Sequence, residues 1–307
     1  MTITDLRIYP IKSLGGISVS EATVEEKGFQ YDRRYMLVSP NGQFITQRAN
    51  HQMALIEVAI ADVSNQSGQG KWLRVWHRNH PDDVLELPLT ISAASSVPTD
   101  HNYLPVDIWD SKEVPAITVS PEADRWFSKV LNEPCRLVFM PEVTRRDVDA
   151  KYAQPDSQGR LPAVSFADGY PYLLIGQASL DELNQRLPAG SPSMEMGRFR
   201  PNIVVEGSSP YEEDTWSHFR VGGMDFYGVK PCARCVLTTI DPATGQKGKE
   251  PLQTLATYRR WNHKILFGQN VLPDPTAVGV LRVGQKLEVL NRQEPWLDAP
   301  NLPLQSR

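Results

Sequence analysis

The chain has 307 residues, enough to bury a substantial core, and this length suits one large domain or two ordinary ones packed together. An apolar share of 40% and a charged share of 22% exclude a disordered chain and a membrane-embedded one. The formal net charge of -4 gives no general attraction to phosphate backbones or anionic lipid, so we expect neither nucleic acid nor a membrane as a partner.

The first residues, MTITDLRIYPIKS, contain an early acid and no long apolar core of the kind that a secretory signal needs. Only three cysteines occur, Cys135, Cys232 and Cys235, and such sparse use speaks against a secreted disulfide framework. We therefore expect a cytoplasmic protein, and we expect it to be a monomer.

Strands and turns are predicted throughout the first hundred residues. β-forming residues predict strands over 3–9 and 17–24, with an irregular, proline- and glycine-containing loop between them. A hairpin is predicted from 35–38 to 44–46, because the intervening Ser-Pro-Asn-Gly suits a tight turn. Further strands are predicted over 54–60, 72–76, 84–87 and 106–109.

Two helices are predicted in the middle of the chain. Ser120 is a suitable N-cap with Pro121 at the first helical position, and apolar residues at helical spacing follow until Pro134. Ser179 and Glu182 have the spacing of a capping box, which predicts a second helix that stops at Pro188. The polar, aperiodic stretch 143–162 between them predicts a solvated surface loop.

Strands are predicted to resume in the last third, over 202–205, 224–227, 236–240 and 280–290. Two isolated helices among many strands lack the βαβ rhythm of a doubly wound sheet. We therefore predict an α+β, β-rich fold that is partly barrel-like.

A pair of cysteines, Cys232 and Cys235, lies beside two cations, Lys230 and Arg234, which are expected to favour thiolate over thiol. Half a zinc site and a dithiol redox pair are the common explanations of this spacing. A zinc site is disfavoured because there is no second such pair and no finger-like histidine spacing. A dithiol of the thioredoxin type precedes a helix, whereas β-branched residues follow here. A metal held mainly by a cofactor needs only one protein thiolate.

Several motifs together resemble the MOSC-domain proteins, specifically the YcbX group of bacterial reductases and the mitochondrial amidoxime-reducing components. The string Cys-x-Arg-Cys-x-x-Thr-Thr-x-Asp-Pro is the most specific of them. In mitochondrial members a serine occupies the position of Ala233, so this chain lacks a hydroxyl there. The motifs span nearly the whole chain and lie at 9–13, 32–33, 166–168, 198–202, 230–242 and 266–269.

The resemblance implies a MOSC N-terminal β-barrel-like unit packed on a MOSC β-barrel domain, which we place at 1–120 and 121–290, followed by a loose tail at 291–307. It implies a molybdenum cofactor, Mo-molybdopterin, whose metal is ligated by Cys235, while Cys232 is expected to be a neighbouring thiol rather than a ligand. The other cofactor-binding positions that it implies are Lys12, Ser13, Arg33, Asp168, Arg200 and Asn202.

The function implied by the resemblance is the reduction of small N-hydroxylated compounds, such as hydroxylaminopurines and amidoximes, by removal of oxygen from the N–OH group. The chain has no flavin, nicotinamide or iron-sulfur motif, so we expect electrons from a separate ferredoxin or flavoprotein reductase. Two alternatives stay open: a non-catalytic carrier of the molybdenum cofactor, and a sulfur carrier that transfers persulfide on Cys235.

Overall fold

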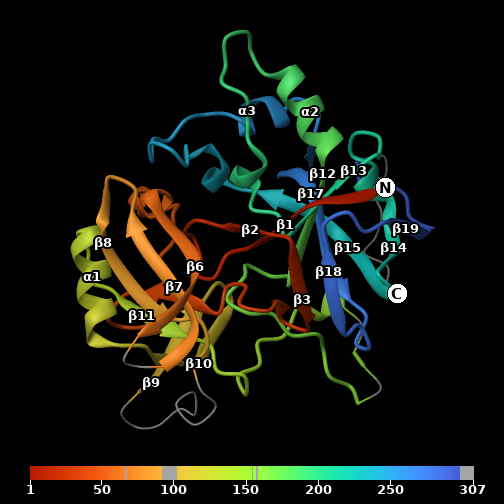
Figure 1. Ribbon diagram of the computed structural model, residues 1–307. Coiled ribbons are helices and arrows are strands. Elements are labelled where there is room, and N and C mark those ends of the chain that lie inside the picture. The colour runs from red at the N-terminus through yellow and green to blue at the C-terminus, as the bar shows by residue number, and fades with distance from the viewer. Residues whose placement is uncertain (66–67, 92–101, 154, 157, 298–307) are drawn as a thin grey trace.

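A computed structural model describes residues 1–65, 68–91, 102–153, 155–156 and 158–297 of the chain. The strand-rich α+β fold predicted from the sequence is confirmed. In Figure 1, strands β6 to β8 and helix α1 form one side of the molecule, and the sheet that contains β14, β15 and β17 forms the other side. Among the described residues, every helix is too short or too polar to span a membrane.

The largest sheet has nine strands, and all neighbouring strands in it are antiparallel except β12 and β13. The N-terminal strand β1 pairs with β13, with Leu6 opposite Ile203, so the start of the chain belongs to the sheet of the second half. In spatial order the strands are β19 (Leu287–Arg292), β14 (Trp216–Val221), β15 (Met224–Arg234), β17 (Lys264–Pro273), β12 (Tyr172–Gly176), β13 (Ile203–Glu206), β1 (Thr2–Ile8) and β2 (Ile17–Val19), with β16 (Arg260–Trp261) beside β17.

Three smaller sheets complete the described part of the fold. The first is β5 (Tyr35–Val38), β11 (Arg136–Phe139), β10 (Ser111–Thr118) and β9 (Tyr103–Ile108). The second is β6 (Ile56–Asn65), β7 (Gly68–His77) and β8 (His80–Pro88), and the third is β18 (Gly279–Arg282), β3 (Glu21–Glu25) and β4 (Gly28–Phe29).

Helix α1 (Pro121–Leu131) confirms the first helix prediction. The Ser120 hydroxyl accepts a hydrogen bond from the Ala123 amide, Pro121 is at the first turn, and Asn132 ends the helix in the left-handed conformation. Its buried face packs Phe127 and Leu131 into the core of the first half. The other helices are α2 (Gln177–Arg186), α3 (Leu252–Leu255) and the 3-10 turns η1 (His51–Leu55), η2 (Ala150–Tyr152), η3 (Met196–Phe199), η4 (Glu212–Thr215) and η5 (Val236–Thr239).

The capping box predicted for the second helix is wrong. Gly176 is the N-cap of α2, so Ser179 lies inside the helix and is fully buried. Its hydroxyl donates to the Glu213 carboxylate at 2.8 Å and accepts from the Tyr211 amide at 2.7 Å. A partner more than thirty residues away therefore replaces the local cap that the spacing predicts.

Some predicted strands differ from the observed ones. The strands predicted at 17–24 and 280–290 are each divided into two, which pair with different neighbours. The predicted hairpin forms its turn, but its second arm makes only a single bridge to β5, between Val38 and Phe44, while the Phe44 amide donates to the Asp107 carbonyl at 3.2 Å. Residues 54 and 55, at the start of the predicted 54–60 strand, belong instead to η1, and β6 begins at Ile56.

The predicted solvated loop over 143–162 is partly wrong. Its described residues, 143–153, 155–156 and 158–162, lack regular structure except for η2, yet Arg146 and Val148 are buried, and an Asp147–Ala163 bridge holds this stretch to the following chain. The predicted tail at 291–307 falls partly outside the described residues, and within them β19 continues to Arg292. The predicted boundary at residue 120 stays a prediction.

Candidate functional site

The two cysteines lie where β15 leaves the large sheet. Cys232 is within β15, and Cys235 immediately precedes η5, a 3-10 turn where the sequence predicted a strand. The Thr238 amide and hydroxyl donate to the Cys235 carbonyl at 3.2 and 3.0 Å, and the Thr239 hydroxyl donates to the Val236 carbonyl at 2.8 Å. These local bonds from threonine side chains replace a strand ladder and hold the backbone after Cys235 in a tight turn.

The thiols differ in their surroundings. Cys235 is exposed, whereas Cys232 is half-buried. Burial raises the pKa of Cys232, and this outweighs Arg234, which acts to lower it. Arg234 is occupied elsewhere, because it donates to the Phe267 carbonyl at 2.9 Å and to the Phe199 carbonyl at 3.1 Å. Lys230 and Arg234 both act to lower the pKa of Cys232, as predicted, but burial outweighs them.

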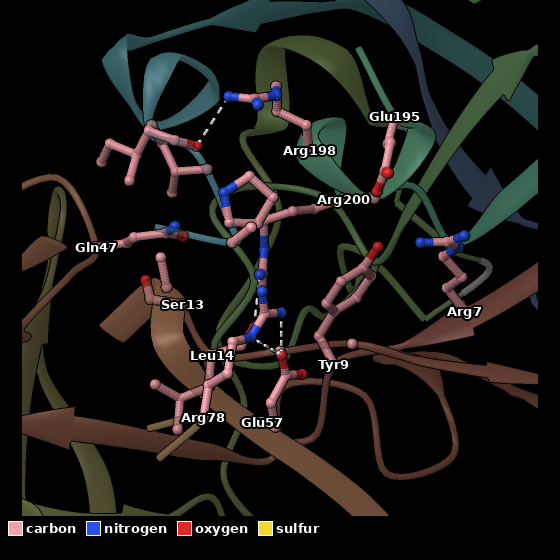
Figure 2. Close-up of a pocket in the computed structure, with 18 residues that line it drawn as sticks. Arg7, Tyr9, Ser13, Leu14, Gln47, Glu57, Arg78, Glu195, Arg198 and Arg200 are labelled. Atoms are coloured by element: carbon pink, nitrogen blue, oxygen red, sulfur yellow. Dashed lines mark hydrogen bonds and ion pairs between the residues drawn. The ribbon is translucent and has the colours of Figure 1, made fainter. Parts of the chain in front are cut away.

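A cavity of about 390 Å³ opens beside η5. It is bounded by the loop after β1, by η1 with the start of β6, by η3, and by the segment from η5 into the following turn. In Figure 2, Ser13 and Gln47 lie on one side of it, Arg7 and Glu195 lie on the other, and Arg198 is at the top. The side chains and backbone groups that line it include Arg7, Tyr9, Ser13, Leu14, Arg78, Arg198, Arg200, Leu237, Ile240 and Pro242.

The arginines of the cavity differ in how fully they are paired. Arg7 and Arg78 form ion pairs with Asp5 and Glu57. Arg198 donates to the Ile240 carbonyl at 3.0 Å and to Asp241 at 3.0 Å, which fastens η3 to the turn after η5.

Arg200 is the least satisfied of these cations. It donates one bond, at 2.6 Å, to the Leu14 carbonyl, and burial lowers its pKa to about 10. In the described part of the chain, its Nη2, the Arg198 Nε and the Tyr9 hydroxyl are buried without a hydrogen-bond partner. Buried donors of this kind call for an acceptor, and an anionic ligand supplies one.

Arg33 and Asn202 are not in the cavity lining but lie behind Arg200. Arg33 donates to Asp32 at 2.6 Å, to Asn202 Oδ1 at 3.1 Å and to the Arg200 carbonyl at 3.2 Å. Asn202 also donates to the Arg7 carbonyl at 3.1 Å. The guanidinium groups of Arg33 and Arg200 lie 4.3 and 4.2 Å from the centre of the Tyr9 ring. This network holds Arg200, whose φ is 57°, in the left-handed conformation.

Lys12 and Asp168 form an ion pair at the edge of the site. Only 6% of the Lys12 side chain is exposed, against 67% for Asp168. Lys12 also donates to the Phe166 carbonyl at 2.8 Å, and the Trp109 indole donates to Asp168 at 3.0 Å. Burial lowers the pKa of Lys12 to about 8, although Asp168 acts to raise it.

The predicted site residues are thus distributed over three surroundings. Cys235 is exposed on the surface, and Ser13 and Arg200 line the cavity. The remaining four form two pairs outside the lining, Arg33 with Asn202 and Lys12 with Asp168. Sequence reasoning did not single out Tyr9, Arg198, Trp109 or Arg146 as site residues. Tyr9 and Arg198 lie within the recognised motifs and could have been found there. Trp109 and Arg146 lie outside them, and no sequence signal indicated their contacts.

We expect the burial of Lys12 to affect stability between pH 8 and 10. In the folded protein its pKa is about 8, whereas the unfolded chain keeps the ordinary value of 10.5. Between these values the unfolded state binds more protons, so the free energy of unfolding rises with pH. Relative to Lys12→Met, the wild type should gain about 2 kcal/mol between pH 7.5 and pH 10 in urea denaturation. Parallel pH profiles for the two proteins would contradict this.

Comparisons with known proteins give two family matches. The MOSC N-terminal beta barrel domain matches residues 1–134, and the MOSC domain matches residues 162–288. Mitochondrial amidoxime-reducing component 1 of Mus musculus is 32% identical over 310 aligned residues, which cover 95% of this chain and 83% of that protein. The human protein of the same name is 30% identical, with the same coverage of both chains.

A second kind of relative is much longer than this chain. Molybdenum cofactor sulfurase of Solanum lycopersicum is 30% identical over 281 residues, which cover 87% of this chain and 32% of the sulfurase. The chain therefore spans about a third of the length of that relative.

Proposed function

The chain belongs to the MOSC domain family, and from this premise we propose that it is a molybdenum-cofactor-dependent reductase of N-hydroxylated compounds. The observation that carries the proposal is the position of Cys235. This exposed thiol immediately precedes η5, and residues that follow it line a cavity containing buried arginine donors without partners in the described part of the chain. Similarity to amidoxime-reducing components over most of both chains supports the same activity.

The residues present fit the cofactor. A molybdopterin carries a phosphate and a polar pterin ring, which together need cations and hydrogen-bond donors around a cavity. Arg200 and Arg198 offer donors without partners, and the Tyr9 hydroxyl is likewise free in the described residues. Ser13 adds a hydroxyl at the cavity wall. The proposed ligand set therefore agrees with the donors that the fold leaves unsatisfied.

The proposed roles follow from chemistry and exposure. Cys235 supplies a soft thiolate ligand to the metal. Arg200 and Arg198 hold the anionic part of the cofactor, while Arg33 and Asn202 position the Arg200 backbone. When bound, the molybdenum cofactor supplies the two-electron redox chemistry that converts an N-hydroxylated substrate and protons into the reduced nitrogen compound and water. The protein's own share is to hold the thiolate ligand and to orient the substrate.

We propose that the electrons come from a separate ferredoxin or flavoprotein reductase, because the sequence contains no dinucleotide, flavin or iron-sulfur motif. The purified chain should then reduce its substrate with dithionite but not with NADH alone. Direct turnover with NADH would contradict the separate donor while leaving the reductase activity itself standing.

The test of the proposal combines metal analysis with a reductase assay. Protein purified from a host that makes the cofactor should contain molybdenum and a phosphate-bearing pterin near one per chain. It should reduce benzamidoxime or a hydroxylaminopurine with dithionite. Bound molybdenum without any reduction would favour the cofactor carrier, persulfide on Cys235 without molybdenum would favour the sulfur carrier, and stoichiometric zinc without pterin would reject all three.

A further inference from the structure

The carboxylate of Asp168 is fixed in place yet keeps one oxygen free. Lys12 and the Trp109 indole both contact Oδ1, the latter at 3.0 Å. Within the described ranges, no hydrogen bond reaches Oδ2, and 67% of the side chain is exposed. Neutralising Lys12 does not require the Trp109 indole to donate to the same oxygen. Because both partners hold Oδ1, the other oxygen, Oδ2, is directed to solvent.

The backbone around Asp168, residues 165–168, is also held in place by hydrogen bonds. Buried Arg146 donates to the Ser165 carbonyl at 2.9 Å and to the Asp168 carbonyl at 2.7 Å, and it also contacts the Ala167 carbonyl. One buried cation therefore fixes the loop and a second one, Lys12, fixes the carboxylate. Such preorganisation lowers the cost of ordering the group when a ligand binds.

Asp168 is connected to the cavity wall through its ion-pair partner. Its partner Lys12 directly precedes Ser13, which lines the cavity. The Asp168 charge also acts on both neighbouring regions, because it raises the pKa of Cys232 and counteracts the lowered pKa of Arg200. The nearby Arg48 guanidinium lies 4.0 Å from the centre of the Trp109 ring and completes the surroundings of the carboxylate.

We propose that Asp168 is a substrate-recognition residue whose Oδ2 accepts a hydrogen bond from an N–H group of the N-hydroxylated substrate. This rests on the proposed function. The substrate class selected is one in which an amino or imino N–H lies next to the N–OH group, as in amidoximes, N-hydroxyguanidines and hydroxylaminopurines. An N-oxide that has no N–H makes no such bond, so its binding does not depend on Asp168. The same oxygen suits a cationic amidine, because hydrogen bonds between charged partners are the strong ones.

The test compares substrates with and without this N–H in the molybdenum-loaded protein. In Asp168→Asn, the KM for benzamidoxime should rise about 10-fold or more, while the KM for pyridine N-oxide changes less than about 2-fold. Because the proposal assigns Asp168 to the substrate, and not to the cofactor as the family resemblance implies, the molybdenum content should stay at the wild-type value. Equal changes in both KM values, or no change in either, would overturn the proposal, as would a loss of molybdenum that accounts for the lost activity.

A second readout does not depend on turnover. Benzamidine has the amidine head but no oxygen to lose, so its dissociation constant can be measured by calorimetry. It should weaken about 10-fold or more in Asp168→Asn, whereas Asp168→Glu, which keeps the charge, should lose much less. Unchanged benzamidine binding in Asp168→Asn would overturn the proposal.

Glu142→Gln is the matched control, since Glu142 is also an exposed carboxylate, 74% accessible, paired with a buried cation, Arg34. It should change neither KM nor benzamidine binding, and an equal loss in this variant would reject a specific role for Asp168. If the wild type reduces neither compound, the proposed function fails, and the benzamidine titration still decides the role of Asp168.

Discussion

Replacing Cys235 with serine should lower benzamidoxime turnover by roughly 1000-fold or more, because a hydroxyl is a poor substitute for a thiolate ligand to a soft metal. Folding should be nearly unaffected. The Cys235 side chain is exposed, and the described residues offer its sulfur no hydrogen bond. Turnover per protein and the melting temperature measure the two effects, and the melting temperature should shift by no more than about 2 °C.

The matched control is Cys232→Ser. Cys232 is half-buried, with its sulfur 3.8 Å from the Ala233 carbonyl, and we expect a neighbouring thiol rather than a ligand. The variant should keep most of the wild-type turnover. Equal losses in the two serine variants would reject the assignment of Cys235 as the single ligand and would favour a function that needs both thiols.

Arg200→Met should lower the affinity for the cofactor by about 10-fold to 100-fold, since it removes a buried charged donor that the proposed ligand would satisfy. Methionine keeps much of the volume, so packing against Tyr9 should be largely retained. Molybdenum per chain after extensive dialysis measures the occupancy, and the rate per bound molybdenum measures the chemistry. The occupancy should fall much more than the rate per metal.

Arg78→Met serves as the control for Arg200. Arg78 also lines the cavity, but it is already paired with Glu57 and 41% of its side chain is exposed. Exposed ion pairs contribute little, so its loss should leave the molybdenum content near the wild-type value. If Arg200→Met kept the full molybdenum content but lost most of the rate per bound molybdenum, Arg200 would act in the chemical step instead. If both variants lost molybdenum equally, the affinity for the cofactor would depend only on the total charge of the cavity.

The sequence alone determined the features that depend on neighbouring residues. Helix α1 follows from Ser120, Pro121 and an apolar stripe that need no distant partner. The strand-rich class follows from many short β-forming runs, and the cysteine string indicates the family because its spacing is so specific. Confirmation of the fold class and of the family shows that such local signals are sufficient at this level.

Tertiary structure decided which of the predicted site residues face a ligand and which hold others in place. Ser179 bonds to Glu213 rather than capping its helix, and Arg33 bonds to Asn202, 169 positions away along the chain. Lys12 reaches Asp168 across 156 positions. Each polar group that folding buries must find a partner, and the partner is whichever group the packing of distant strands brings within hydrogen-bond distance. The sequence shows which groups need partners, whereas only the fold shows which of them, like the Arg200 Nη2, still have none among the described residues.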